Sequence, residues 1–183
     1  MTTELEATHP SGALLEGRFS GPTEFSALIR HSFAAAAEQG WREIILCDST
    51  FEDWPLGERA VAQCLNDWSR SGRKLTMLAK NYNEVVRRHS RFVTWRQTWA
   101  HVVECRANAA ISFDDMPSAL WSPVWVFQRL DVVRCTGVSG SGAQARRFKR
   151  AAGSLPNTQL ARVCCDHVGF VTSPAWCNFI GRA

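Results

Sequence analysis

Residues 41–106 set the expected fold class of this chain, and they read WREIILCDSTFEDWPLGERAVAQCLNDWSRSGRKLTMLAKNYNEVVRRHSRFVTWRQTWAHVVECR. Two nearly continuous apolar runs, 43–47 and 75–79, are typical of strands that are buried on both faces of a sheet. Between them, apolar side chains recur at helical spacing over 60–68, and Gly72 stands where a helix would end. A connection that contains a helix is too long for a hairpin, so we expect two parallel strands in a right-handed βαβ unit.

Periodicity and turn residues assign the other segments in the same way. In chain order they are an edge strand at 13–19, a helix at 22–38, a helix at 81–99 that is continuous or broken near Ser90, a strand at 101–106, an irregular connection at 108–120, one bent strand or a hairpin at 123–135, and a flexible turn at 139–142 that leads into a helix at 143–152. Together they predict an α/β fold with a mainly parallel sheet of five to six strands, flanked by helices.

The domain organisation follows from length and composition. With 183 residues the chain is expected to form a single α/β domain at 13–156, after a loose leader at 1–12 and before a Cys-containing C-terminal extension at 157–183. The leader lacks the basic and apolar regions of a signal peptide, and no apolar run reaches the roughly 20 residues of a membrane span. We therefore expect a cytoplasmic protein that does not enter a membrane.

The seven cysteines point to reduced thiols, because they are odd in number and form no CxxC motif. The one Cys/His group worth testing as a metal site consists of Cys164, Cys165, His167 and Cys177. Adjacent cysteines are atypical of zinc sites, so neither a metal nor another cofactor is expected.

Two groups of basic residues are candidates for binding an anionic ligand. Arg87, Arg88 and Arg91 cluster on the helix at 81–99, beside its tryptophans. A second group lies in the helix expected at 143–152, and its members are Arg146, Arg147 and Arg150, with Lys149 between them. Guanidinium groups bind phosphate well, and arginines beside tryptophans suit a nucleic acid, which the net charge of +4 also permits. The alternative is an ordinary solvated helix face.

An acidic loop follows the first core strand and supports a different function. Asp48, Glu52 and Asp53 lie at the carboxyl end of an expected parallel strand, the edge where open α/β sheets usually bind ligands. These carboxylates could hold a divalent cation in a phosphodiester- or phosphate-processing enzyme. The alternative is that the loop caps the next helix.

No catalytic signature decides between these hypotheses. The sequence contains no GxSxG, HExxH or phosphate-binding glycine motif. The leading prediction is therefore a non-enzymatic or degenerate binding domain for an anionic group or a protein partner. A homo-oligomer formed through exposed tryptophans is a further possibility.

The segment 75–106, LTMLAKNYNEVVRRHSRFVTWRQTWAHVVECR, resembles the central part of an uncharacterised proteobacterial domain family. Its members stand alone or follow GNAT acetyltransferase domains, and the family is distantly similar to half of a phospholipase D fold. The resemblance covers about 40–156 and implies a phospholipase D-like half or a similar three-layer sandwich. The HxKxxxxD motif of phospholipase D is missing, since His89 is followed by Ser90-Arg91 and His101 by Val102-Val103. The resemblance thus implies a fold but no activity.

Overall fold

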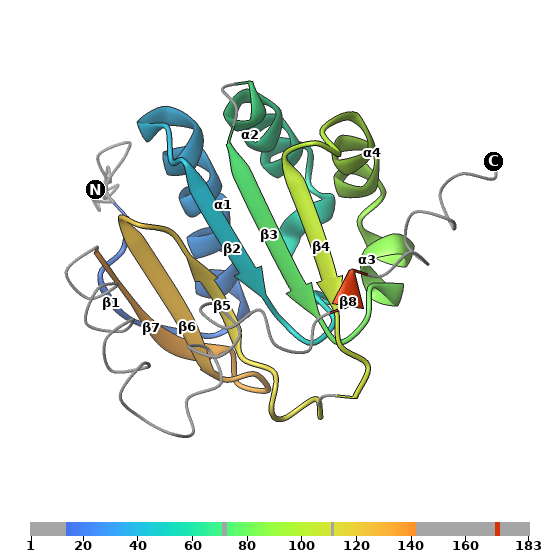
Figure 1. Ribbon diagram of the computed structural model, residues 1–183. Coiled ribbons are helices and arrows are strands. Elements are labelled where there is room, and N and C mark those ends of the chain that lie inside the picture. Colours follow the sequence, from blue (N-terminus) through green and yellow to red (C-terminus); the bar gives the residue numbers. More distant parts are fainter. Residues whose placement is uncertain (1–13, 71–72, 111, 142–170, 173–183) are drawn as a thin grey trace, which may run out of the picture.

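A computed structural model describes residues 14–70, 73–110, 112–141 and 171–172 of the chain. The strands are β1 (Gly17–Ser20), β2 (Glu43–Cys47), β3 (Lys74–Ala79), β4 (Val103–Ala107), β5 (Ser118–Trp121), β6 (Trp125–Asp131), β7 (Thr136–Ser141) and β8 (Val171–Thr172). The helices are α1 (Pro22–Gln39), α2 (Arg59–Ser69), α3 (Asn83–Arg88) and α4 (Ser90–Thr98), with a 3₁₀ turn η1 at Pro55–Gly57. Figure 1 shows how these elements are arranged.

All eight strands form one mixed sheet in the order β1-β7-β6-β5-β2-β3-β4-β8. Only the pairings β2–β3 and β3–β4 are parallel, and the five other pairings are antiparallel. The predicted mainly parallel sheet of five to six strands is therefore wrong. The βαβ unit of residues 43–79 does form, but the described part of the chain contains no helix between β4 and β7. Short connections without a helix join antiparallel strands, which is the outcome here.

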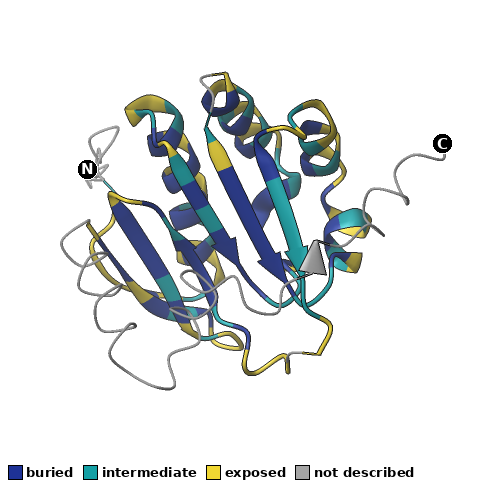
Figure 2. Ribbon diagram, viewed as in Figure 1, coloured by how far each residue is buried: buried dark blue, intermediate teal, exposed yellow. Residues whose placement is uncertain are grey.

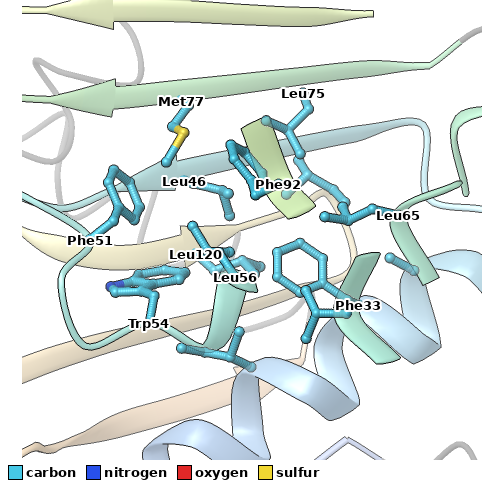
Figure 3. Packing of buried hydrophobic residues seen from close by; sticks show 14 of the residues in the cluster. Phe33, Leu46, Phe51, Trp54, Leu56, Leu65, Leu75, Met77, Phe92 and Leu120 are labelled. Atoms are coloured by element: carbon cyan, nitrogen blue, oxygen red, sulfur yellow. The ribbon is translucent and has the colours of Figure 1, made fainter. Parts of the chain in front are cut away.

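The helices share one hydrophobic core with the sheet. The buried hydrophobic side chains of α1 to α4, together with Leu56 of η1, belong to a single cluster with the β-strand residues that face them. Its centre includes Phe33, Leu65 and Leu120 (Figure 3), and the burial of the central strands is shown in Figure 2. On the opposite face a second, small cluster contains Cys47, Leu78 and Met116 and no residue of the described helices. The described residues thus form two layers and not the expected three-layer sandwich.

The helix ends agree with the local sequence signals. Helix α1 begins with Pro22, and it ends at Gly40, whose left-handed φ of 70° lets its N–H reach the carbonyl of Ala36. The helix expected at 81–99 is broken, since His89 leaves helical geometry between α3 and α4. Of the two alternatives, the break near Ser90 is confirmed.

Two segments that were expected to be irregular, 108–120 and 139–142, contain strand residues. Their sequences lack the alternation of apolar and polar residues that usually indicates a strand. The expected irregular connection contains β5, and the expected turn at 139–142 contains the end of β7. Strand β7 is rich in Gly and Ser, but it is paired on both sides, by β1 and β6. Gly137 is needed there, because a side chain would collide with the carbonyl oxygen of Gln128 and the ring of Phe19. The helix expected at 143–152 lies outside the described residues.

No helix in the described part of the chain combines the length and the apolar composition that crossing a bilayer requires.

Candidate functional site

The structure brings the acidic loop and the first group of arginines together. Glu52 accepts a hydrogen bond from Arg88, which also donates to Glu84 on its own helix. Glu84 accepts hydrogen bonds from Arg87 as well. The hydrogen bond from Arg87, followed by that from Arg88, lowers the pKa of the Glu84 carboxyl. One ion pair, between Glu52 and Arg88, therefore joins the two groups that the sequence offered as rival sites, and Arg87 is paired with Glu84 of its own helix.

Asp48 is a buried structural carboxylate. Its Oδ1 accepts the backbone N–H groups of Thr50 at 3.0 Å and Phe51 at 2.9 Å. Its Oδ2 accepts the indole N–H of Trp54 at 3.1 Å and Nη2 of Arg129 at 2.9 Å. A carboxylate has about four lone-pair positions, and here four donors use them. Asp48 thus has no acceptor position left for a metal ion or a substrate proton.

Arg129 of β6 is the cation that organises this loop, and the sequence analysis missed it. Its side chain is only 1% exposed and is shared between Asp48 and Asp53, with both oxygens of Asp53 accepting hydrogen bonds. Its Nε donates to the hydroxyl of Ser118 at 3.0 Å, and the guanidinium carbon lies 4.3 Å from the ring centre of Phe25. Burial alone would lower the pKa of Arg129, but the hydrogen bond to Asp53 and the two carboxylate charges raise it above its ordinary value.

One signal in the sequence could have revealed this residue. Arg129 stands in the strand segment WVFQRLD, whose first three residues are apolar and buried. A buried guanidinium requires a carboxylate partner, and the acidic loop supplies two. The sequence does not show which loop carboxylates face β6, because Asp48 and Arg129 are 81 residues apart.

The junction of α3 and α4 holds the loop from its other side. Phe51 is buried with a positive φ of 57°, which is uncommon for a bulky residue. Its carbonyl oxygen accepts a hydrogen bond from Nε2 of His89 at 2.8 Å. Burial lowers the pKa of His89, while the hydrogen bond to Phe51 acts in the opposite direction. Figure 3 shows Phe51 and Trp54 side by side at the edge of the core.

Of the remaining candidate residues, only Arg91 lies in the part of the chain that the structure describes. Arg91 donates through Nη1 to the backbone carbonyl of Gly57 at 3.0 Å and makes no ion pair with another described residue. Arg146, Arg147 and Arg150 lie outside the described residues, and so do the cysteines of the C-terminal extension. Within the described residues, no group of three or more His, Cys, Asp or Glu side chains could hold a metal ion.

Comparisons with known proteins give a fold relationship. No protein-family model matches the chain, and no curated protein matches it. Among solved structures, TrmBL2, an archaeal chromatin protein that shows a novel mode of DNA binding, is similar with a TM-score of 0.52 and 16% sequence identity. The match covers 81% of this chain and 54% of that one, so this chain spans about half the length of the archaeal protein. At this identity the likeness concerns the fold alone, and the resemblance to phospholipase D stays a prediction.

Proposed function

We propose that this chain is a non-catalytic binding domain whose partner is another protein. The observation that carries the proposal is that each carboxylate of the acidic loop forms an ion pair with an arginine of the same chain. Asp48 and Asp53 bind Arg129, and Glu52 binds Arg88. General acid–base catalysis and metal binding both require carboxylate oxygens that can face a substrate or an ion. These oxygens instead hold β2, β6 and α3 together.

A protein partner is favoured over an anionic ligand by the pairing of the arginines. A phosphate or carboxylate ligand would have to compete with Glu84 and Glu52 for Arg87 and Arg88. Large apolar side chains, in contrast, are exposed at several positions, and interfaces between proteins are built on such groups. They are Leu15, Phe113, Val124, Leu130, Val132, Val133 and Val138.

Binding to nucleic acid is the second candidate. The net charge of +4 favours it, and so does the guanidinium of Arg91, which makes no ion pair with another described residue. The similar archaeal protein binds DNA, but a likeness of 16% identity supports the transfer of a fold and not of a ligand. Non-specific binding of a basic domain to DNA has dissociation constants of about 10⁻⁴–10⁻⁶ M at physiological salt, so weak binding alone would not identify a function.

Two measurements separate the candidates. The tagged protein is cross-linked reversibly in its own cells, purified with and without nuclease treatment, and compared with a tagged control domain. In parallel, fluorescence anisotropy follows titrations of labelled duplex DNA and single-stranded RNA at physiological salt. We expect a protein partner that survives nuclease treatment and nucleic-acid affinities no tighter than the non-specific range. Loss of every partner with nuclease, together with much tighter duplex binding that Arg91→Glu weakens, would establish the second candidate instead.

A further inference from the structure

The tip of the β6–β7 hairpin, residues 130–134, exposes an unusual set of side chains. Val133 is 95% exposed, Leu130 65% and Val132 53%, although hairpin turns are normally polar. Three exposed aliphatic side chains thus stand within four consecutive residues at the tip. Single exposed apolar residues are common, but a cluster of this kind marks an interaction site.

The buried Arg129 network explains why Leu130 faces outward. The pairing of β6 with β7 shifts its register between Arg129 and Asp131, which is a β-bulge. Arg129 is drawn inward by its bonds to Asp48, Asp53 and Ser118. The next side chain along the strand, Leu130, is then directed to solvent. Bulges often serve to redirect a side chain in this way.

The tip is also held in one conformation. Oδ1 of Asp131 accepts the backbone N–H of Arg134 at 2.9 Å, and the thiol of Cys135 lies 3.6 Å from the carbonyl oxygen of Val132. Cys135 has a positive φ of 52°, and its carbonyl accepts the N–H of Gly21 at 3.1 Å, which ties the turn to the start of α1. An apolar group that is already ordered loses little conformational entropy when it binds.

The charges around the tip indicate the class of partner. Asp131 lies in the tip, and Asp53 lies close by, with its carboxylate 4.0 Å from the thiol of Cys135. Arg134 is the one cation of the tip, and Nη1 of its guanidinium lies 3.6 Å from Oδ2 of Asp131. Arg129 is shared by Asp48 and Asp53, so that group keeps a net negative charge, and the side chains of Asp53 and Asp131 are 42% and 36% exposed. Polyanions such as nucleic acids and anionic bilayers are attracted by clustered positive charge, which the described residues of the tip do not offer.

We propose that the tip at 130–134 docks into an apolar pocket of a partner protein, whose rim places basic side chains opposite Asp53 and Asp131. Val133 is the central anchor, and Leu130 and Val132 surround it, as in interfaces where a few desolvated residues dominate the binding free energy. This inference rests on the proposed protein-binding function and names the surface that carries it.

The test uses the full chain with a photo-crosslinking amino acid at position 133. The matched control places the same group at Val124, which is 47% exposed in the β5–β6 turn, at the opposite end of β6. After irradiation in cells, cross-linked proteins are identified, expressed and purified, and their dissociation constants are measured for wild type, Val133→Asp and Val124→Asp. We expect a protein cross-linked from 133 and not from 124. For that protein, Val133→Asp should weaken binding at least about tenfold, and Val124→Asp should leave it within about twofold.

Several outcomes would overturn the inference. One is that position 133 cross-links to nucleic acid or lipid; another is that the identified protein binds Val133→Asp as tightly as wild type. If the same partner is cross-linked from 124 but not from 133, the proposed docking surface at 130–134 is wrong, while the proposed protein-binding function stands. If neither position nor the reversible cross-linking yields a partner protein, both proposals fail. Val133 is 95% exposed and Val124 47% exposed, so both variants should unfold close to the wild-type temperature; this measurement then shows that any loss of binding is local.

Discussion

Replacing Arg129 with Met tests whether the buried ion network organises the acidic loop. The Met side chain fills most of the space of the arginine stem, so the change mainly removes the charge and its hydrogen bonds. Asp48, whose side chain is 5% exposed, would keep its three N–H donors but lose its cation. Removing one partner of a buried ion pair costs about 3–5 kcal/mol, because the other charge is left uncompensated.

Asp53 adds little to this cost. Its side chain is 42% exposed and can return to water, so its share is about 0–1 kcal/mol. The expected loss in free energy of unfolding is therefore about 3–6 kcal/mol in total. For a chain of this size, each kcal/mol lowers the unfolding temperature by about 2–4 °C, which gives a fall of roughly 6–24 °C.

Urea unfolding followed by tryptophan fluorescence measures the effect, with Arg134→Met as control. Arg134 is 82% exposed, so its replacement should change the free energy of unfolding by less than about 0.5 kcal/mol. In the double variant Asp48→Asn/Arg129→Met, the buried charge is removed as well. Its destabilisation should be smaller than the sum of the single changes by about 0.5–3 kcal/mol. If Arg129→Met unfolds at the urea concentration of wild type, the network does not hold the loop and the reasoning is refuted.

Two further changes test neighbouring parts of the fold. Burial lowers the pKa of His89 in the folded protein, so as the pH falls the imidazole is protonated in the unfolded chain before it is protonated in the folded one. The stability that the neutral imidazole contributes is therefore complete above a pH of about 6.5 and is lost as the pH falls through the folded pKa. His89→Gln, which keeps an N–H donor for the Phe51 carbonyl, should therefore show a smaller fall in unfolding temperature than wild type between about pH 7 and pH 5, and equal falls would contradict the assignment. Gly137→Ala should cost about 1–3 kcal/mol in urea unfolding, because the new methyl group collides with the backbone of Gln128 and with Phe19; a loss below about 0.5 kcal/mol would show that β7 can move aside.

The part of the fold that could be predicted from sequence is the part that depends on local periodicity. The apolar runs 43–47 and 75–79 and the helix between them form as expected, because both strands are central in the sheet and their neighbours in sequence are also neighbours in space. The direction of strand pairing beyond β4 was mispredicted because parallel pairing was extended to strands that no helix connects. Strand β7 was missed since its Gly and Ser residues are ordered by β1 and β6, which lie far away in the sequence.

In the candidate site, too, the features that depend on local sequence could be predicted, and those that depend on distant contacts could not. The acidic loop does lie at the carboxyl end of β2, as the order of elements implied. Its chemistry could not be predicted, because that depends on contacts with Arg129 and Arg88, 81 and 36 residues away from their partners. A carboxylate that is free for catalysis and one that is neutralised by a distant arginine have the same sequence signature.

The most direct test of the central claim, that the carboxylates of the acidic loop are structural, is a titration of the ¹⁵N-labelled protein with Mn²⁺ followed by NMR. A bound Mn²⁺ ion broadens the amide signals near it. We predict that the amide signals of residues 48–54 keep their intensity at one equivalent of Mn²⁺, relative to the signals of α2 on the same molecule. Selective loss of the 48–54 signals, reversed by a chelator and absent in Asp48→Asn, would show that the loop binds a metal ion and would contradict the account.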